Sequence, residues 1–278
     1  MPELPEVETI RRQLDTVVLG RTIAKLRILD ALTVSPNSPN RLRRSVEGRR
    51  IDATDRRGKY LMLQLDSGDT LAIHLRMTGR LHHSPDGVAP DDRHRRARFE
   101  FDDGATLDFS DTRRFGRIWI VPANPDAPNA YWDARLGVEP LGRGFTPAHL
   151  AQLLEGRTAP IKASILDQKL IAGVGNIYAD EALFQAGVHP TRRAGSLDSD
   201  EIVALREAIR DRLKAGIRSG GASIDRYRDT IGNAGTMQDI LRVHLHEGDA
   251  CGTCGSTIVK TRVAGRGTYF CPTCQPVD

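Results

Sequence analysis

Carbonyl chemistry is suggested by the first residues of the chain, where Pro2, Glu3 and Glu6 stand close together. Removal of Met1 would leave Pro2 with a secondary amine whose pKa is near the α-amino value of about 8. Such an amine can attack a carbonyl carbon and form an iminium, a permanent cation that acts as an electron sink. The same stretch is also typical of a helix start, because Pro5 suits a first turn and the carboxylates complement the positive helix end. The two interpretations are compatible.

Metal binding is predicted at the other end of the chain, where the only four cysteines form two Cys-x-x-Cys pairs separated by sixteen residues. This spacing lets two knuckles meet at one tetrahedral zinc. The predicted ligands are Cys251, Cys254, Cys271 and Cys274. Because thiolates fill all four positions, we expect one structural zinc with no open position for catalysis. A predicted hairpin over 258–270 joins the pairs and carries Arg266 between two glycines.

Further candidate residues stand beside glycines or at strand ends. Asn176 follows Gly173-Val-Gly at a predicted helix start, where backbone N–H groups can bind a phosphate. Lys59 opens a predicted strand beside Gly58. Met77 and Phe115 neighbour arginines, and such apolar side chains can prise a base from a DNA stack. A place in the core is the alternative for both of them, and simple solvation is the alternative for Lys59.

Composition limits the class of protein. A length of 278 residues suggests two domains. The formal charge of +4 is a weak sign of nucleic-acid binding, but arginine dominates lysine and clusters along the chain, which suits phosphates and base edges. An arginine-rich solvated surface is the alternative. No apolar run approaches the about 20 residues of a membrane span and no leader-like segment precedes the first helix, so we expect a cytoplasmic protein.

The elements that would hold these residues fall into two blocks. After an N-terminal helix, short strands are predicted at 22–29, 60–65, 70–75, 98–101, 106–109 and 117–121, a spacing that favours an antiparallel sandwich or barrel. Helices are predicted at 147–154, 161–166, 177–185 and 202–217. Asp198 and Glu201 form a capping-box-like start for the last helix. The predicted class is α+β, with an interdomain linker at 123–144.

Four motifs, in order, resemble the bacterial formamidopyrimidine-DNA glycosylases of the formamidopyrimidine/endonuclease VIII family. They are Pro2–Glu8, Gly58–Tyr60, Val174–Ala179 and the four-cysteine finger, and the resemblance covers nearly the whole chain. It implies a catalytic β-sandwich domain at 1–122, a helix-two-turn-helix domain at 145–248, a zinc finger at 249–278 and a DNA groove between the first two. The implied partner is double-stranded DNA with oxidised bases or abasic sites, bound at the nucleoid by a monomer.

The resemblance also implies roles for individual residues. Pro2 would attack C1′ of the lesion nucleotide, Glu3 would act as acid and base, and Glu6 would support them. Lys59 and Arg266 would contact the phosphate beside the lesion and assist the chemistry. The implied DNA contacts are His74, Met77, Arg113, Arg114, Phe115, Lys162, Asn176 and Tyr178. Among these, Met77, Arg113 and Phe115 would fill the void left by the flipped base, and Arg113 would read the estranged cytosine.

The implied activity is that of a bifunctional DNA glycosylase and abasic-site lyase. It would remove 8-oxoguanine opposite cytosine and formamidopyrimidines through a Schiff base on Pro2, then nick the strand by β,δ-elimination with no cofactor beyond zinc. The same chemistry on oxidised pyrimidines is the nearest alternative, although Leu4 favours the purine branch, whose relatives lack the glycine typical of endonuclease VIII there. A non-catalytic zinc-ribbon binder of damaged DNA is a further alternative, but it has no use for a Pro2 amine beside Glu3.

Three departures from the family pattern make the lesion preference less certain than the backbone chemistry. Arg76 stands where glycine is usual before Met77. Gly235–Gln238 lacks a common aromatic pair, and Val243–His246 replaces a usual Val-Tyr-Gly-Arg run. The last two lie in or just after the segment expected to cap the flipped base.

Overall fold

The structure is a computed structural model that describes residues 1–88, 90–224 and 227–277. It divides into two compact units, each built from two separate stretches of chain. The first unit comprises Met1–Ala134 and Ser219–Thr236, and the second comprises Arg135–Arg218 and Met237–Asp278. Within the described ranges, no helix has the length and apolar character needed to cross a membrane.

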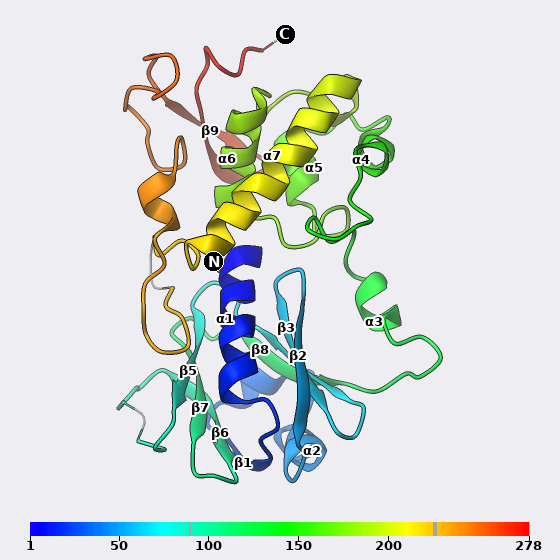
Figure 1. Ribbon diagram of the computed structural model, residues 1–278, viewed down its shortest axis with the longest axis vertical. Helices are drawn as coiled ribbons and strands as arrows, with labels where there is room; N and C mark the ends of the chain where they lie inside the picture. Colours follow the sequence, from blue (N-terminus) through cyan, green and yellow to red (C-terminus); the bar gives the residue numbers. More distant parts are fainter. Residues whose placement is uncertain (89, 225–226, 278) are drawn as a thin grey trace. The chain divides into compact units, whose positions relative to one another are not determined.

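The first unit contains two antiparallel four-stranded sheets, which confirms the predicted sandwich class (Figure 1). One sheet has the order β1-β6-β7-β5 and the other β2-β3-β4-β8. The strands are β1 (Ile23–Ile28), β2 (Ile51–Arg57), β3 (Tyr60–Leu65), β4 (Thr70–His74), β5 (Gly79–Ser84), β6 (Arg95–Phe101), β7 (Thr106–Asp111) and β8 (Arg117–Val121). Apolar side chains from both sheets and from helix α1 (Leu4–Val17) form one buried core.

Two of the eight strands, β2 and β5, are missing from the predicted set. Their sequences are Ile-Asp-Ala-Thr-Asp-Arg-Arg and Gly-Arg-Leu-His-His-Ser, in which charged and histidine side chains outnumber the apolar ones. Pairing makes them strands: β2 pairs with β3 across a tight hairpin, and β5 pairs with β7, which lies more than twenty residues further along the chain. Tertiary pairing overrides local propensity in such segments.

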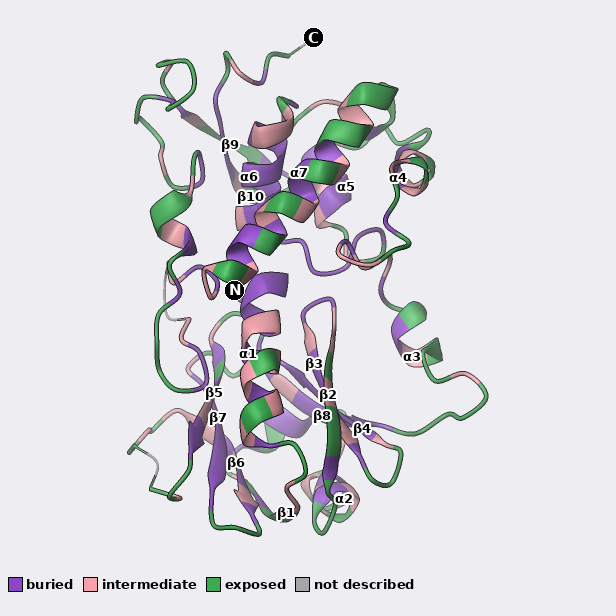
Figure 2. Cartoon of the chain, in the orientation of Figure 1, coloured by how far each residue is buried: buried purple, intermediate pink, exposed green. Residues whose placement is uncertain are grey.

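The second unit is built from helices and a terminal hairpin, as predicted. Its helices are α4 (Pro147–Leu154), α5 (Ile161–Leu166), α6 (Asn176–Ala186) and α7 (Ser199–Arg218), and its hairpin is β9 (Val259–Val263) with β10 (Arg266–Phe270). The predicted capping box opens α7, because Asp198 accepts from the Glu201 backbone N–H and Glu201 accepts from that of Asp198. Helix α6 is largely buried, whereas α7 has both buried and exposed positions (Figure 2).

Two segments differ from their sequence-based placement. Residues 219–236, included in the predicted helical domain, cluster with the first unit. The predicted linker contains a short helix, α3 (Ala130–Asp133), whose Trp132 is buried with its ring 5.4 Å from that of Tyr60. Helix α2 (Pro39–Val46), also in the first unit, is not among the predicted helices and is capped by Ser38, whose hydroxyl accepts from the Arg41 backbone N–H.

Candidate functional site

The N-terminal turn places Pro2 directly before two buried carboxylates. Glu3 is the N-cap of α1 and forms a capping box with Glu6, and the Glu3 backbone N–H donates to Glu6 Oε2 over 2.7 Å. Glu3 is 3% exposed and Glu6 1% exposed. A capping box fixes the backbone at a helix start, so the residue before Glu3 is held in one position.

Glu6 also binds the segment that returns to the first unit. Its second oxygen, Oε1, accepts from the Ala222 backbone N–H over 2.8 Å, and the Tyr227 hydroxyl donates to its carbonyl over 3.3 Å. Further along α1, Gln13 donates to Asp229 and accepts from both the backbone N–H and the hydroxyl of Thr230. The segment is therefore bonded to α1 through Ala222, Tyr227, Asp229 and Thr230.

Lys59 occupies the two-residue turn between β2 and β3, next to Gly58, whose φ is +56°. The lysine is buried, and His74 at the end of β4 lies near it. Burial, together with the charges of Arg76 and Lys59, lowers the pKa of His74 to about 3. His74 is thus neutral, and its Nδ1 accepts the Arg76 backbone N–H over 3.0 Å.

The three side chains expected to enter DNA lie at the surface of two adjoining turns. Met77 is 41% and Phe115 48% exposed, so the alternative of a place in the core does not hold for either. Arg113 is exposed and its guanidinium carbon lies 4.9 Å from the centre of the Phe115 ring. Thr78 connects the turns, because its hydroxyl bonds to Asp111 and accepts the Arg113 backbone N–H over 3.2 Å.

The backbone of these turns is unusual at two arginines. Arg76 has φ +53° and Arg114 has φ +60°, a region that side chains with a Cβ disfavour. Glycine adopts this conformation readily, which agrees with the glycine that the resemblance described above gives as usual at the position of Arg76. Arg114 differs from its neighbours because its guanidinium forms two hydrogen bonds to Asp30 of the same unit, although half of its side chain is exposed.

A buried network in the second unit centres on Lys162, whose side chain has no exposed surface. Its ammonium lies 2.7 Å from Asp180 Oδ1 and donates to the Thr268 hydroxyl over 2.8 Å and to the Gly267 carbonyl over 3.0 Å. His244 Nδ1 lies 2.7 Å from the other Asp180 oxygen. Lys162 is therefore bonded to the finger hairpin. Because its side chain is fully buried, it could contact DNA directly only if the residues around it moved apart.

The same hairpin presents Arg266 to solvent directly after the Ala264-Gly265 turn. Asn176 begins α6 and donates to the Gly267 carbonyl over 2.9 Å. Tyr178 is buried, and a Cβ at Gly216 would lie 2.4 Å from its hydroxyl, which shows how closely α6 and α7 pack there. The structure thus brings Lys162, Asn176 and Arg266 together and places Tyr178 inside the unit.

The four cysteines form a site for a single structural zinc. Their sulfur atoms all lie within 4.8 Å of one another, with Cys251 3.9 Å from Cys274 and Cys254 3.4 Å from Cys271. Tetrahedral thiolates at Zn–S distances of about 2.3 Å stand about 3.8 Å apart, so the donor set fits this metal. Cys251 and Cys271 pack with Phe184 of α6 in a small apolar cluster.

Several residues of the site carried no signal in the sequence. Asp180 and Gln13 were not singled out in the sequence, and His244 only as part of the departure at 243–246; Asp180 meets His244, and Gln13 meets Asp229, across more than sixty residues. Glu181 is similar: its buried carboxylate accepts backbone N–H groups from 242, 243 and 244, which fixes the turn that leads to His244. In the sequence, the adjacent carboxylates Asp180 and Glu181 within a mostly apolar helix were the one sign of this buried network.

Comparison with known proteins gives matches along nearly the whole chain. Residues 1–118 match the formamidopyrimidine-DNA glycosylase N-terminal domain, 136–228 its H2TH domain, and 248–277 a zinc finger found in FPG and IleRS. The formamidopyrimidine-DNA glycosylase of Roseiflexus sp. (strain RS-1) is 44% identical over 99% of this chain and all of its own. That of Chloroflexus aggregans is 46% identical over 99% of this chain and 98% of its own.

Solved structures agree with these matches. A Lactococcus lactis FPG variant in complex with Fapy-dG-containing DNA superposes with a TM-score of 0.92 at 35% identity, covering 99% of this chain and all of the other. The wild-type Lactococcus lactis protein in complex with oxidised-pyrimidine-containing DNA superposes with a TM-score of 0.90 at 34% identity and the same coverage.

Proposed function

Because the chain belongs to the formamidopyrimidine-DNA glycosylase family, we propose that it is a base-excision repair enzyme that removes damaged bases from duplex DNA. In the finer form of the proposal, it excises 8-oxoguanine opposite cytosine and formamidopyrimidines and then nicks the strand as an abasic-site lyase. One observation carries the proposal: Pro2 directly precedes two buried carboxylates, Glu3 and Glu6, which the capping box fixes in place.

The proposed chemistry starts from the Pro2 nitrogen after removal of Met1. Its lone pair attacks C1′ of the lesion nucleotide, and the bond from C1′ to the base breaks with its electrons leaving on the base. In this proposal Glu3 donates a proton to O4′ as the C1′–O4′ bond breaks, which opens the sugar ring and leaves the iminium. The resulting iminium acidifies C2′, so loss of a C2′ proton expels the 3′ phosphate, and a second elimination expels the 5′ phosphate. The zinc, held by four cysteines, supplies only the fold of the finger.

The remaining candidate residues would hold the flipped nucleotide. Flipping costs a few kcal/mol, and Met77, Arg113 and Phe115 are exposed on neighbouring turns where they can replace the lost stacking. Arg266 and Lys59 would contact phosphates. For Asn176 we propose a phosphate contact from the start of α6, and for Lys162 and Tyr178 a supporting role from within the unit, since both are buried.

Borohydride trapping on a duplex with an oxidised base tests the proposal, because reduction of the iminium joins enzyme and DNA covalently. We expect an adduct with the wild type and a much lower yield with Pro2→Gly, whose primary amine lacks the proline ring. An adduct of equal yield from both proteins would refute Pro2 as the nucleophile. The mass of the N-terminal peptide is needed alongside, since a Met1–Pro2 peptide bond turns the amine into an amide without a nucleophilic lone pair.

Oxidised pyrimidines form a second candidate substrate class, because a related Lactococcus lactis protein has been captured with DNA that contains one. A panel of matched duplexes separates the two classes. Faster excision of 8-oxoguanine than of dihydrouracil supports the purine assignment, and the reverse order would replace it with the pyrimidine assignment.

A further inference from the structure

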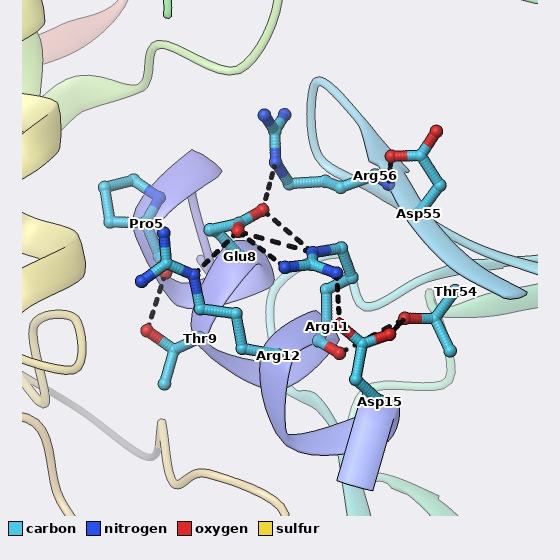
Figure 3. Close-up of polar contacts among 9 residues, drawn as sticks. All are labelled: Pro5, Glu8, Thr9, Arg11, Arg12, Asp15, Thr54, Asp55 and Arg56. Atoms are coloured by element: carbon cyan, nitrogen blue, oxygen red, sulfur yellow. Dashed lines mark hydrogen bonds and ion pairs between the residues drawn. The ribbon is translucent and has the colours of Figure 1, made fainter. Parts of the chain in front are cut away.

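Glu8 lies at the centre of a charged cluster on the first helix, six residues after the proposed nucleophile (Figure 3). It accepts from Arg11 at 3.0 Å, Arg12 at 2.9 Å and Arg56 at 3.2 Å. Burial alone would raise the pKa of Glu8, but the hydrogen bonds from Arg11 and Arg12 outweigh it and the pKa is lowered. Glu8 is therefore a constant negative charge near neutral pH and an anchor for cations rather than an acid or a base.

Arg56 differs from the other two arginines because it comes from a different element and reaches a second partner. It belongs to β2 and its side chain is 9% exposed, whereas Arg12 on α1 is 59% exposed. While Arg56 Nε faces Glu8, its Nη1 donates to the Gly58 carbonyl over 2.9 Å. One guanidinium thus joins α1 to the two-residue turn between β2 and β3.

That turn carries Lys59. Arg57 pairs with Tyr60 in the ladder, so Gly58 and Lys59 alone form the connection. A turn this short has few ways to move, and a hydrogen bond to the Gly58 carbonyl fixes the peptide that leads directly into Lys59. The planar fork of arginine suits this double contact, since it presents several donors in fixed directions while lysine offers a single point charge.

We propose that Arg56, oriented by Glu8, is a positioning residue of the reaction: it holds the Lys59 turn in register with the helix start that bears Pro2 and Glu3. The inference rests on the proposed function, because it assigns Arg56 a role through Lys59. Arg11 and Arg12 contact the same carboxylate from α1 itself, three and four residues further along the helix, so they hold Glu8 from its own element.

The test uses single-turnover cleavage of a duplex with one abasic site, measured as a rate constant and as the enzyme concentration at half-maximal rate. Arg56→Ala should lower the rate constant by about 100-fold, the loss expected from a misplaced catalytic group, and leave the half-saturating concentration unchanged. Arg12→Ala is the matched control, since it removes another partner of Glu8 without touching Gly58, and it should behave as the wild type. Arg56→Lys should be as slow as Arg56→Ala, because a point charge does not reproduce the fork.

A double variant distinguishes positioning from a general loss of structure. If Arg56 acts through Lys59, then Arg56→Ala should slow the Lys59→Ala enzyme no further, because residues that act as a unit are not additive. The inference would be overturned if the rate of the double variant were reduced by the product of the two single losses. A wild-type rate constant in Arg56→Ala or in Arg56→Lys would overturn it as well. Failure of the proposed function looks different: the wild type itself would then give no cleavage and no trapped adduct.

Should Arg56→Ala not fold, Arg56→Lys keeps the charge beside Glu8 and carries the same test. A folded Arg56→Lys enzyme with the wild-type rate constant would show that the bond to the Gly58 carbonyl is dispensable and would reject the inference. A slow one with an unchanged unfolding midpoint and half-saturating concentration supports it.

Discussion

Substitution of Lys162 by methionine should destabilise the second unit more than removal of any surface charge. Both Lys162 and Asp180 have no exposed side-chain surface, and the ammonium lies 2.7 Å from the carboxylate. Removing one partner of a buried pair leaves the other charge uncompensated, at a cost of about 3–5 kcal/mol. Thr268 and Gly267 would also lose a donor, which releases the backbone next to Arg266.

Urea unfolding followed by two signals measures this effect. Far-ultraviolet circular dichroism reports mainly on the helices of the second unit, whereas both tryptophans, Trp119 and Trp132, lie in the first unit and provide an internal control. The dichroism midpoint of Lys162→Met should fall by roughly 1–2 M, with the tryptophan midpoint retained if the units unfold independently. Lys260→Met removes an exposed ion pair with Glu247 and should leave both midpoints near the wild type.

A double variant decides whether the charge imbalance is the cause. Asp180→Leu in the Lys162→Met background removes the uncompensated carboxylate, and paired apolar replacements of buried ions are often neutral or stabilising. The double variant should therefore be more stable than Lys162→Met alone. If it is less stable, or if Lys162→Met matches Lys260→Met, then the buried pair does not have the energetic role assigned to it.

Three further predictions follow from the described residues. Chelation of zinc should unfold the finger hairpin and abolish DNA binding; retained hairpin dichroism after complete metal removal would contradict the assignment. The pKa of His74 is lowered to about 3 in the folded protein. Below about pH 6.5, His74 therefore binds a proton in the unfolded chain but not in the folded protein. Stability should be full above pH 6.5 and fall by up to about 1.4 kcal/mol per pH unit below it, a slope that His74→Gln should reduce in denaturation at pH 6.5 and 5. Gly216→Ala, normally a helix-stabilising change, should instead cost about 1–3 kcal/mol because its Cβ meets the Tyr178 ring; a raised midpoint would refute that contact.

Local signals in the sequence predicted much of the fold. The strands predicted at 60–65 and 70–75 pair as β3 and β4 across an Asp-Ser-Gly-Asp turn, and those predicted at 98–101 and 106–109 lie in β6 and β7, which pair across an Asp-Asp-Gly turn. Strands β3 and β8 have the predicted bounds. Turn chemistry and cysteine spacing act over a few residues, so a single sequence contains the whole signal.

Long-range pairing explains what the sequence did not predict. Residues 219–236 join the first unit because Ala222 bonds to Glu6 and Thr230 to Gln13, partners more than two hundred residues away. The resemblance implied a DNA contact for Lys162, and only its pairing with Asp180, which also contacts His244, shows how its charge is compensated where it is buried. Rules based on periodicity or on residue spacing do not predict such contacts between residues that are distant in the sequence.

The residues proposed to act on DNA share one structural principle, which the sequence alone does not reveal. The turn at Pro2 is fixed by Glu6, the turn at Lys59 by Arg56 and Glu8, and the hairpin at Arg266 by Lys162 and Asp180. In each case a carboxylate takes part in holding a short turn by its backbone and does not itself need to titrate. Neutral replacements of Glu8 or Asp180 should therefore slow the reaction by the same factor across the pH range, whereas replacement of Glu3, the proposed acid and base, should change the shape of the pH profile.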